Sequence, residues 1–118
     1  MNYSLNINDR PFNAIKNGTK KVEGRTKVKE NDVAYENMIL GDTITFTNKI
    51  TGEIMTCEIL YVSKYPNVRN MLESEGTKNV LSSGLDVEGG ITSYNSLQDY
   101  EEGIKIHGIY AIGVKKIS

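Results

Sequence analysis

The alternation of apolar and polar residues along the chain predicts several short strands. Residues 2–8 alternate strictly, with Tyr3, Leu5 and Ile7 as the apolar positions, which is the period of a half-buried strand. The same alternation returns over residues 43–47 and 55–61, and the short link between these segments contains Gly52. A glycine in such a link suits a hairpin turn, so we expect a β-hairpin over residues 43–62.

The C-terminal segment shows the same period but is interrupted. Residues 104–106 and 110–114 alternate on either side of Gly108. This pattern predicts one long strand bent at the glycine, or two shorter strands. The polar segment 27–38 is weakly patterned, so we expect it to form a loop or a single helical turn.

Three segments have helical spacing instead. The apolar positions predict helices near residues 11–17, 67–75 and 87–99. Gly18 follows the first of them and can adopt the left-handed conformation that ends a helix. Asp86 precedes the third and can cap its N-terminus.

Together these elements predict an α+β fold, a small β-barrel with short helices packed around it. The pattern does not call for parallel strands, and we expect none. A chain of 118 residues can build one hydrophobic core but not two independent ones. We therefore expect a single domain over residues 1–118.

The composition places the chain among globular proteins. It is 38% apolar and 25% charged, and no apolar run approaches the ~20 residues of a membrane helix. The first residues lack the basic and apolar regions of a signal peptide. Cys57 is the single cysteine, so the chain has no internal disulfide. We expect a cytoplasmic protein with no membrane partner.

The charges are unevenly distributed along the chain. Residues 1–29 hold seven Lys or Arg and two acidic residues, a net charge of +5, whereas the remaining 89 residues carry −6. A basic segment of this kind can attract phosphate groups. The alternative is that the two charges mix in space after folding.

The residue types exclude several kinds of chemistry. One histidine and one cysteine cannot supply the four N or S ligands of a structural zinc site. No phosphate-binding Gly-x-x-x-x-Gly-Lys-Ser/Thr loop occurs. A serine triad could draw only on His107, and no nucleophile-elbow pattern surrounds any serine. We expect neither a metal nor a cofactor.

The segment Gly18–Arg25 carries the strongest concentration of chemistry. It contains Lys20, Lys21, Glu23 and Arg25, and we expect a strand over residues 20–26. Glu23 and Arg25 would then share a face, roughly 6.5 Å apart along the strand. At that spacing they could share one ligand or bond each other loosely. If the strand begins at residue 20, Lys21 joins that face and Lys20 points away.

This segment, read as Gly-x-Lys-x-x-Glu-x-Arg, resembles the signature of the ASCH (activating-signal-cointegrator homology) domain. Other segments resemble the family in the same order along the chain: Pro11-Phe12 with Ile15, Gly41-Asp42, Met71-Leu72 with Glu75-Gly76, Tyr94, and residues 108–112. The resemblance implies a PUA-like barrel, associated with RNA modification and binding. It implies a cleft between barrel and helices that the motif faces, and selects Lys20 over Lys21 for that cleft.

Three functions remain open. The first is an RNA- or nucleotide-binding module, for which the candidate contacts are Lys20, Lys21, Glu23, Arg25, Lys27 and Tyr94. The second follows from the resemblance, because some small ASCH proteins remove the acetyl group from N-acetylated cytidine without a metal. Its candidate residues are Lys20, Glu23 and Glu75, although those enzymes have a threonine where this chain has Glu23. The third is a protein-interaction domain that binds no nucleic acid.

Overall fold

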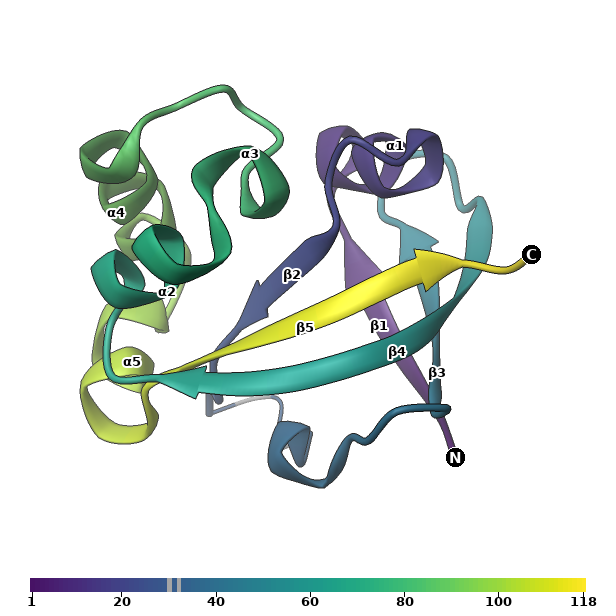
Figure 1. The fold of residues 1–118 in the computed structure, drawn as a ribbon, viewed down its shortest axis with the longest axis horizontal. Coiled ribbons are helices and arrows are strands. Elements are labelled where there is room, and N and C mark those ends of the chain that lie inside the picture. The colour runs from purple at the N-terminus through teal and green to yellow at the C-terminus, as the bar shows by residue number, and fades with distance from the viewer. Residues whose placement is uncertain (30, 32) are drawn as a thin grey trace.

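The computed structural model describes residues 1–29, 31 and 33–118. Figure 1 shows a curved sheet with α1 over one end and four helices gathered at the other. The elements in chain order are β1 (Asn2–Ile7), α1 (Asp9–Asn17), β2 (Val22–Arg25), η1 (Tyr35–Asn37), β3 (Thr43–Asn48), β4 (Ile54–Tyr65), α2 (Val68–Glu75), α3 (Thr77–Val80), α4 (Val87–Asn95), α5 (Tyr100–His107) and β5 (Ile109–Lys116). The α+β class is as predicted.

The five strands form one mixed sheet in the order β1-β3-β4-β5-β2. The predicted hairpin is present as the antiparallel pair β3–β4. β1 pairs with β3 in parallel, from Asn2 opposite Thr43 to Ile7 opposite Asn48, so our expectation of no parallel strands was wrong. Apolar alternation sets which face a strand buries, but it does not set strand direction.

The sheet curls into a half-barrel and does not close in the described part of the chain. β1 and β2 occupy its two edges, so the small β-barrel predicted from the sequence takes the form of a half-barrel in the described residues. The two edges are instead linked by a side chain, because Arg25 Nη2 of β2 donates to the backbone oxygen of Asn6 in β1 at 2.8 Å. We call this gap between the edges the seam.

The prediction of a strand at residues 104–106 was wrong, because this segment lies in helix α5. Ile104 is buried, whereas Ile106 is 65% exposed. Acidic residues occupy the first turn of α5 and Lys105 and His107 its last turn, which suits the helix dipole. Two isoleucines separated by one residue imitate strand alternation over too short a stretch to decide. Only Ile109–Lys116 forms the C-terminal strand.

Two hydrophobic cores lie on opposite faces of β5. Tyr110, Ile112 and Val114 pack into the core inside the half-barrel. Ile109 and Ala111 pack into a second core beneath the four helices α2–α5. Because successive side chains of a strand point to opposite faces, the nearly continuous apolar run of β5 buries both. This strand therefore holds the barrel half and the helical half together.

The long strand β4 changes face midway. A bulge falls between Ile59 and Tyr61, and a bulge inserts one extra residue into the ladder. The alternation predicts that Ile59 and Tyr61 share one buried face. Ile59 is fully buried, but Tyr61 is 40% exposed.

Among the described residues, no helix has both the length and the hydropathy needed to cross a membrane.

Candidate functional site

A cleft of about 370 Å³ lies along the seam, between the motif strand, the start of α1 and the helical half. Residues from β1 and α1 form one wall, including Asn6 and Arg10. The loop after α3 and the end of α4 form the other, including Ser82, Ser83 and Tyr94. The cleft therefore occupies the position where a closed barrel would have its last strand pair.

The turn before β2 places Lys20 on the cleft floor. Gly18 adopts φ +87° and ends α1, and the Lys20 amide then bonds to Ala14 O at 3.1 Å. Regular strand begins only at Val22, not at residue 20 as predicted. The Lys20 side chain, 4% exposed, donates from Nζ to Val22 O at 2.6 Å and also to Val80 O, and its Nζ lies 3.2 Å from Glu23 Oε1.

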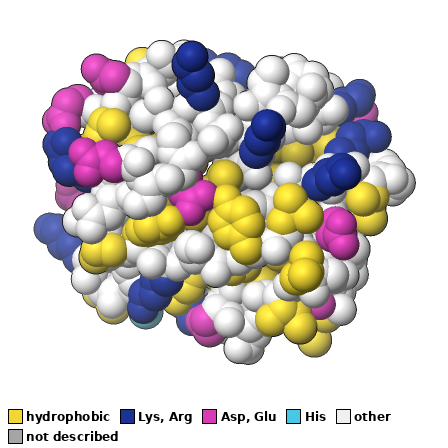
Figure 2. Space-filling view, viewed as in Figure 1, with side chains coloured by type: hydrophobic (Ala, Val, Ile, Leu, Met, Phe, Trp, Pro, Cys, Tyr) yellow, Lys and Arg dark blue, Asp and Glu magenta, His cyan; other side chains and the backbone are white. Residues whose placement is uncertain are grey.

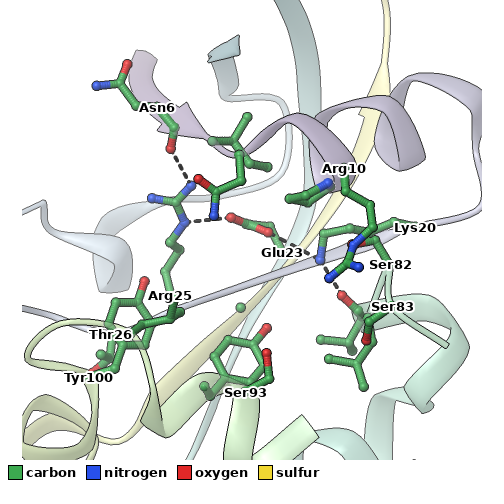
Figure 3. Close-up of a pocket in the computed structure, with 18 of the residues that line it drawn as sticks. Asn6, Arg10, Lys20, Glu23, Arg25, Thr26, Ser82, Ser83, Ser93 and Tyr100 are labelled. Atoms are coloured by element: carbon green, nitrogen blue, oxygen red, sulfur yellow. Dashed lines mark hydrogen bonds and ion pairs between the residues drawn. The ribbon is translucent and has the colours of Figure 1, made fainter. Parts of the chain in front are cut away.

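Glu23 and Arg25 continue this arrangement into one chain of charges. Arg25 Nε donates to Glu23 Oε2 at 2.6 Å, a closer contact than the loose pairing expected from strand spacing. Figure 3 shows the consecutive contacts from Lys20 to Glu23, to Arg25 and on to Asn6. The side chains of Glu23 and Arg25 are only 9% and 13% exposed. The motif is therefore a buried network of three charges with a net charge of +1.

Burial and mutual attraction act against each other in this network. Burial lowers the pKa of Lys20 below its ordinary value, and the Glu23 carboxylate only partly restores it. Burial alone would raise the pKa of Glu23, but Arg25 and Lys20 outweigh it and hold that pKa below the ordinary value. Burial likewise opposes the charge of Arg25, yet Glu23 raises its pKa. The carboxylate is thus ionised, with a cation on each oxygen.

Gly24 allows a tyrosine to approach the motif strand directly. A Cβ at this position would lie 2.4 Å from Tyr94 Oη and 3.1 Å from Met71 Cε, distances that real Cβ atoms do not show. The backbone at Gly24 has no left-handed conformation, so the glycine is required for space. It fixes Tyr94 against the cleft floor between Glu23 and Arg25.

Three tyrosines supply the aromatic surface of the cleft. Tyr94 and Tyr100 stack with ring centroids 6.3 Å apart and planes 20° apart, and Tyr35 also lines the cleft. Burial raises the pKa of Tyr100 to about 12 and also raises the pKa values of Tyr94 and Tyr35. All three hydroxyls are therefore neutral at pH 7 and can donate or accept a hydrogen bond.

The cleft also holds two basic side chains that the sequence analysis missed. Arg10, in the first turn of α1, and Lys49, just after β3, both line it and are exposed. Figure 3 places Arg10 at the Lys20 end of the cleft and Tyr100 at the Arg25 end. Within residues 1–29, 31 and 33–118, neither Arg10 nor Lys49 takes part in an ion pair.

Not all predicted site residues lie in this cleft. The structure brings Lys20, Glu23, Arg25 and Tyr94 together there. Lys21 is exposed on the other side of the turn and lines a separate groove. Lys27 forms an ion pair with Glu36 at 2.5 Å, outside the set of residues that line the cleft.

Glu75 is also held elsewhere. Its carboxylate accepts from Tyr61 Oη and Tyr65 Oη, both at 2.5 Å, and it does not line the cleft. The predicted set of Lys20, Glu23 and Glu75 therefore does not assemble. Among the described residues, no group of three or more His, Cys, Asp or Glu side chains could hold a metal ion.

The missed residues had only weak signals in the sequence. Arg10 belongs to the basic segment of residues 1–29, but no local pattern distinguishes it from the other basic residues of that segment. Lys49 lies in the region of acidic net charge, and it reaches the cleft because its amide bonds to Ile7 O at 2.9 Å. That contact depends on the parallel β1–β3 pairing, which the pattern did not predict.

Comparison with known proteins identifies both the fold and the family. The family model for the ASCH domain matches residues 5–118. A crystal structure of hypothetical protein PH0355 superposes with a TM-score of 0.83 at 30% identity, covering 99% of this chain and 100% of that one. The solution structure of protein PF0455 from Pyrococcus furiosus gives 0.75 at 29% identity, covering 100% and 99%.

A mutant of the ASCH protein ZmASCH from Zymomonas mobilis superposes with a TM-score of 0.62 at 15% identity, covering 99% of this chain and 75% of that one. A search among curated proteins found no match. At 15% identity the Zymomonas structure supports the fold alone, whereas the family model covers nearly the whole chain. The half-barrel fits a PUA-like fold, and the chain belongs to the ASCH-domain family.

Proposed function

We propose that the cleft binds single-stranded RNA or a nucleotide within it. The observation that carries this proposal is the arrangement of charges. A buried Lys20–Glu23–Arg25 network forms the floor, and the exposed Arg10 and Lys49, which form no ion pair among the described residues, also line the cleft. The five side chains give the cleft a net charge of +3, although the chain as a whole carries −1. Such a local positive site favours an anionic ligand.

The two parts of the cleft suit different parts of a nucleotide. Arg10 and Lys49 are the exposed cations, so they would contact phosphate oxygens. The hydroxyls of Tyr94 and Tyr100 and the remaining lone pairs of Glu23 would read a base edge or a ribose hydroxyl. Aromatic rings and hydrogen bonds to unstacked bases are the usual means by which proteins recognise single-stranded RNA.

The test is an anisotropy titration of a fluorescent RNA 12-mer against wild type, Arg10→Gln and Lys49→Gln. Each variant should bind more weakly, and the slope of log affinity against log salt should become shallower by about 0.7, since one phosphate contact is lost. Lys105→Gln removes an exposed lysine of α5 and serves as the matched control. Equal affinities for all four proteins would refute the proposal.

A second candidate is a metal-independent amidohydrolase acting on N-acetylated cytidine or a related nucleoside. The observation that favours it is the burial of Lys20, which lowers its pKa as expected for a lysine acting as base or nucleophile. Against it, Lys20 Nζ has three acceptors, in Glu23, Val22 and Val80. Three acceptors favour the protonated ammonium, which has no lone pair with which to attack a substrate.

Hydrolysis of N-acetylcytidine distinguishes the RNA-binding candidate from the amidohydrolase candidate. Wild type incubated with N-acetylcytidine, without added metal, should release no acetate if the cleft only binds. If the protein is an amidohydrolase, wild type should release acetate. Lys20→Arg should abolish that release, since a guanidinium stays protonated. Absence of both turnover and RNA binding would leave the interaction-domain alternative.

A further inference from the structure

A second depression lies on the opposite side of the α1–β2 turn from the cleft. It has a volume of about 410 Å³, and we call it the lysine groove. Its apolar lining comes from Ile15 of α1, Leu60 of β4 and Val114 of β5. Its polar lining is dominated by lysine: Lys16, Lys20, Lys21, Lys115 and Lys116, with Asn17 and Gly18 beside them.

Most of this positive charge is available to a partner. Lys16 is paired with Glu53 at 2.6 Å, and Lys20 is committed to Glu23. No ion pair to Lys21, Lys115 or Lys116 occurs among residues 1–29, 31 and 33–118. In Figure 2, Lys and Arg side chains gather at the upper right of the face, over α1 and the end of β5.

The groove adjoins the cleft. Lys20 lines both, so only the turn at residues 18–21 separates them. Its outer lysines come from two segments far apart in the sequence, the α1–β2 turn and the end of β5, that the β2–β5 ladder brings side by side. Glu58 lies opposite Lys115 in the β4–β5 ladder and, like Glu53 beside Lys16, reduces this positive charge.

We propose that the lysine groove is a backbone-contacting extension of the cleft, so that the ligand is an RNA strand several nucleotides long. This inference rests on the proposed function of the cleft. The described residues that line the groove present ammonium groups but no aromatic ring, so they suit contacts with phosphates and not base stacking. One part of the strand is read in the cleft, and the adjoining phosphates cross the turn and lie against Lys21, Lys115 and Lys116.

Strand length provides the test. At about 3.4 Å per phosphate of a stacked strand, a 12-mer spans about 40 Å, longer than the 33 Å greatest dimension of the protein. A trimer spans only about 10 Å and fills the cleft alone. Both RNAs, fluorescently labelled, are titrated with wild type and with Lys115→Gln/Lys116→Gln at several salt concentrations.

The double variant should bind the 12-mer roughly tenfold more weakly at low salt, with a salt slope shallower by about 1.4, because two phosphate contacts are lost. Its affinity for the trimer should equal that of wild type. Lys64→Gln/Lys105→Gln removes two exposed lysines near α5 and should leave both affinities unchanged. All four lysines are exposed, and equal melting temperatures would verify that the variants are folded.

Three outcomes would overturn the proposal. Equal 12-mer affinity for wild type and the Lys115→Gln/Lys116→Gln variant would reject the groove while leaving the cleft function standing. No RNA binding by wild type at any length would reject both. Wild type and the Lys115→Gln/Lys116→Gln variant can also be titrated with a fluorescent acidic, leucine-containing peptide. If the variant binds both RNAs as wild type does but binds this peptide more weakly, the groove is assigned to a protein partner instead.

Discussion

Two adjacent lysines have opposite environments in this protein. Lys20 is buried on the cleft floor, where Glu23 and two backbone oxygens hold its ammonium. Lys21 is exposed beside the lysine groove and has no ion pair among the described residues. The floor of the cleft therefore holds charges that are fixed in position, whereas the groove holds charges on exposed side chains. Fixed charge can discriminate between ligands, whereas free charge mainly attracts them.

The difference in burial between the two regions also sets how much each charge contributes to the free energy of unfolding. Exposed ion pairs contribute about 0–1 kcal/mol because water and salt screen them. A buried charge that loses its partner costs far more, because it stays desolvated without compensation. Substitutions in the cleft floor should thus affect the fold, and substitutions in the groove should affect only binding.

The largest expected effect is that of Glu23→Gln. It leaves Lys20 and Arg25 buried without their shared carboxylate, and we expect a loss of about 3–5 kcal/mol in the free energy of unfolding. Chemical denaturation by urea measures it. Glu53→Gln, which removes the exposed partner of Lys16, is the matched control and should change stability by less than about 1 kcal/mol. Similar losses in both variants would contradict the contrast between the two regions.

The next effect in size is that of Gly24→Ala. The added methyl group would lie 2.4 Å from Tyr94 Oη, and we expect overpacking of this kind to cost about 1–3 kcal/mol. Adding Tyr94→Phe removes the closest clashing atom and should restore part of the loss. Thermal melts of the single and double variants decide the matter, and no rescue by the second substitution would show that the clash is not the cause.

Acid should also lower the stability of the folded protein, because it protonates Glu23 in the cleft floor. The folded-state pKa of Glu23 lies below its ordinary value of 4.5, so the unfolded chain takes up the proton first as pH falls. The stability contributed by Glu23 is therefore complete above pH 4.5 and is lost as pH falls through the depressed pKa. Melting temperatures of wild type and Glu23→Gln should converge in that range, and a constant difference down to pH 2 would count against this account.

The smallest effect concerns the groove. Glu53→Gln frees Lys16 from its ion pair and adds one available cation beside Lys21. Affinity for the RNA 12-mer should rise a few fold at low salt, with a salt slope steeper by about 0.7, while trimer affinity stays the same. Unchanged affinity and an unchanged salt slope for the 12-mer would mean that Lys16 does not face the strand.

Local patterns in the sequence predicted most of the strands and helices. The hairpin, β1 and the helices near residues 11–17 and 67–75 follow directly from their periodicity. The third helix ends at Asn95, short of residue 99. The errors concern long-range pairing and short stretches: the direction of β1 against β3, the open seam, and α5, where two isoleucines imitated a strand.

The site residues show the same division between local and long-range features of the sequence. The motif pointed to Lys20, Glu23 and Arg25 because they are close in sequence. Arg10 and Lys49 reach the cleft through tertiary contacts that no local pattern encodes, and Glu75 is held away from it by two tyrosines on β4. The seam itself depends on which strands end the sheet, and strand order is not readable from alternation alone.

The Lys20 ammonium has a consequence for how this motif should be read in other chains. By donating to Val22 O and Val80 O, it joins the sheet to the helical half at a single atom. A descendant that lost its ligand would still need that junction to fold. We therefore expect the Lys-x-x-Glu-x-Arg spacing to persist as a mark of ancestry, while the residues equivalent to Arg10 and Lys49 diverge with whatever each protein binds.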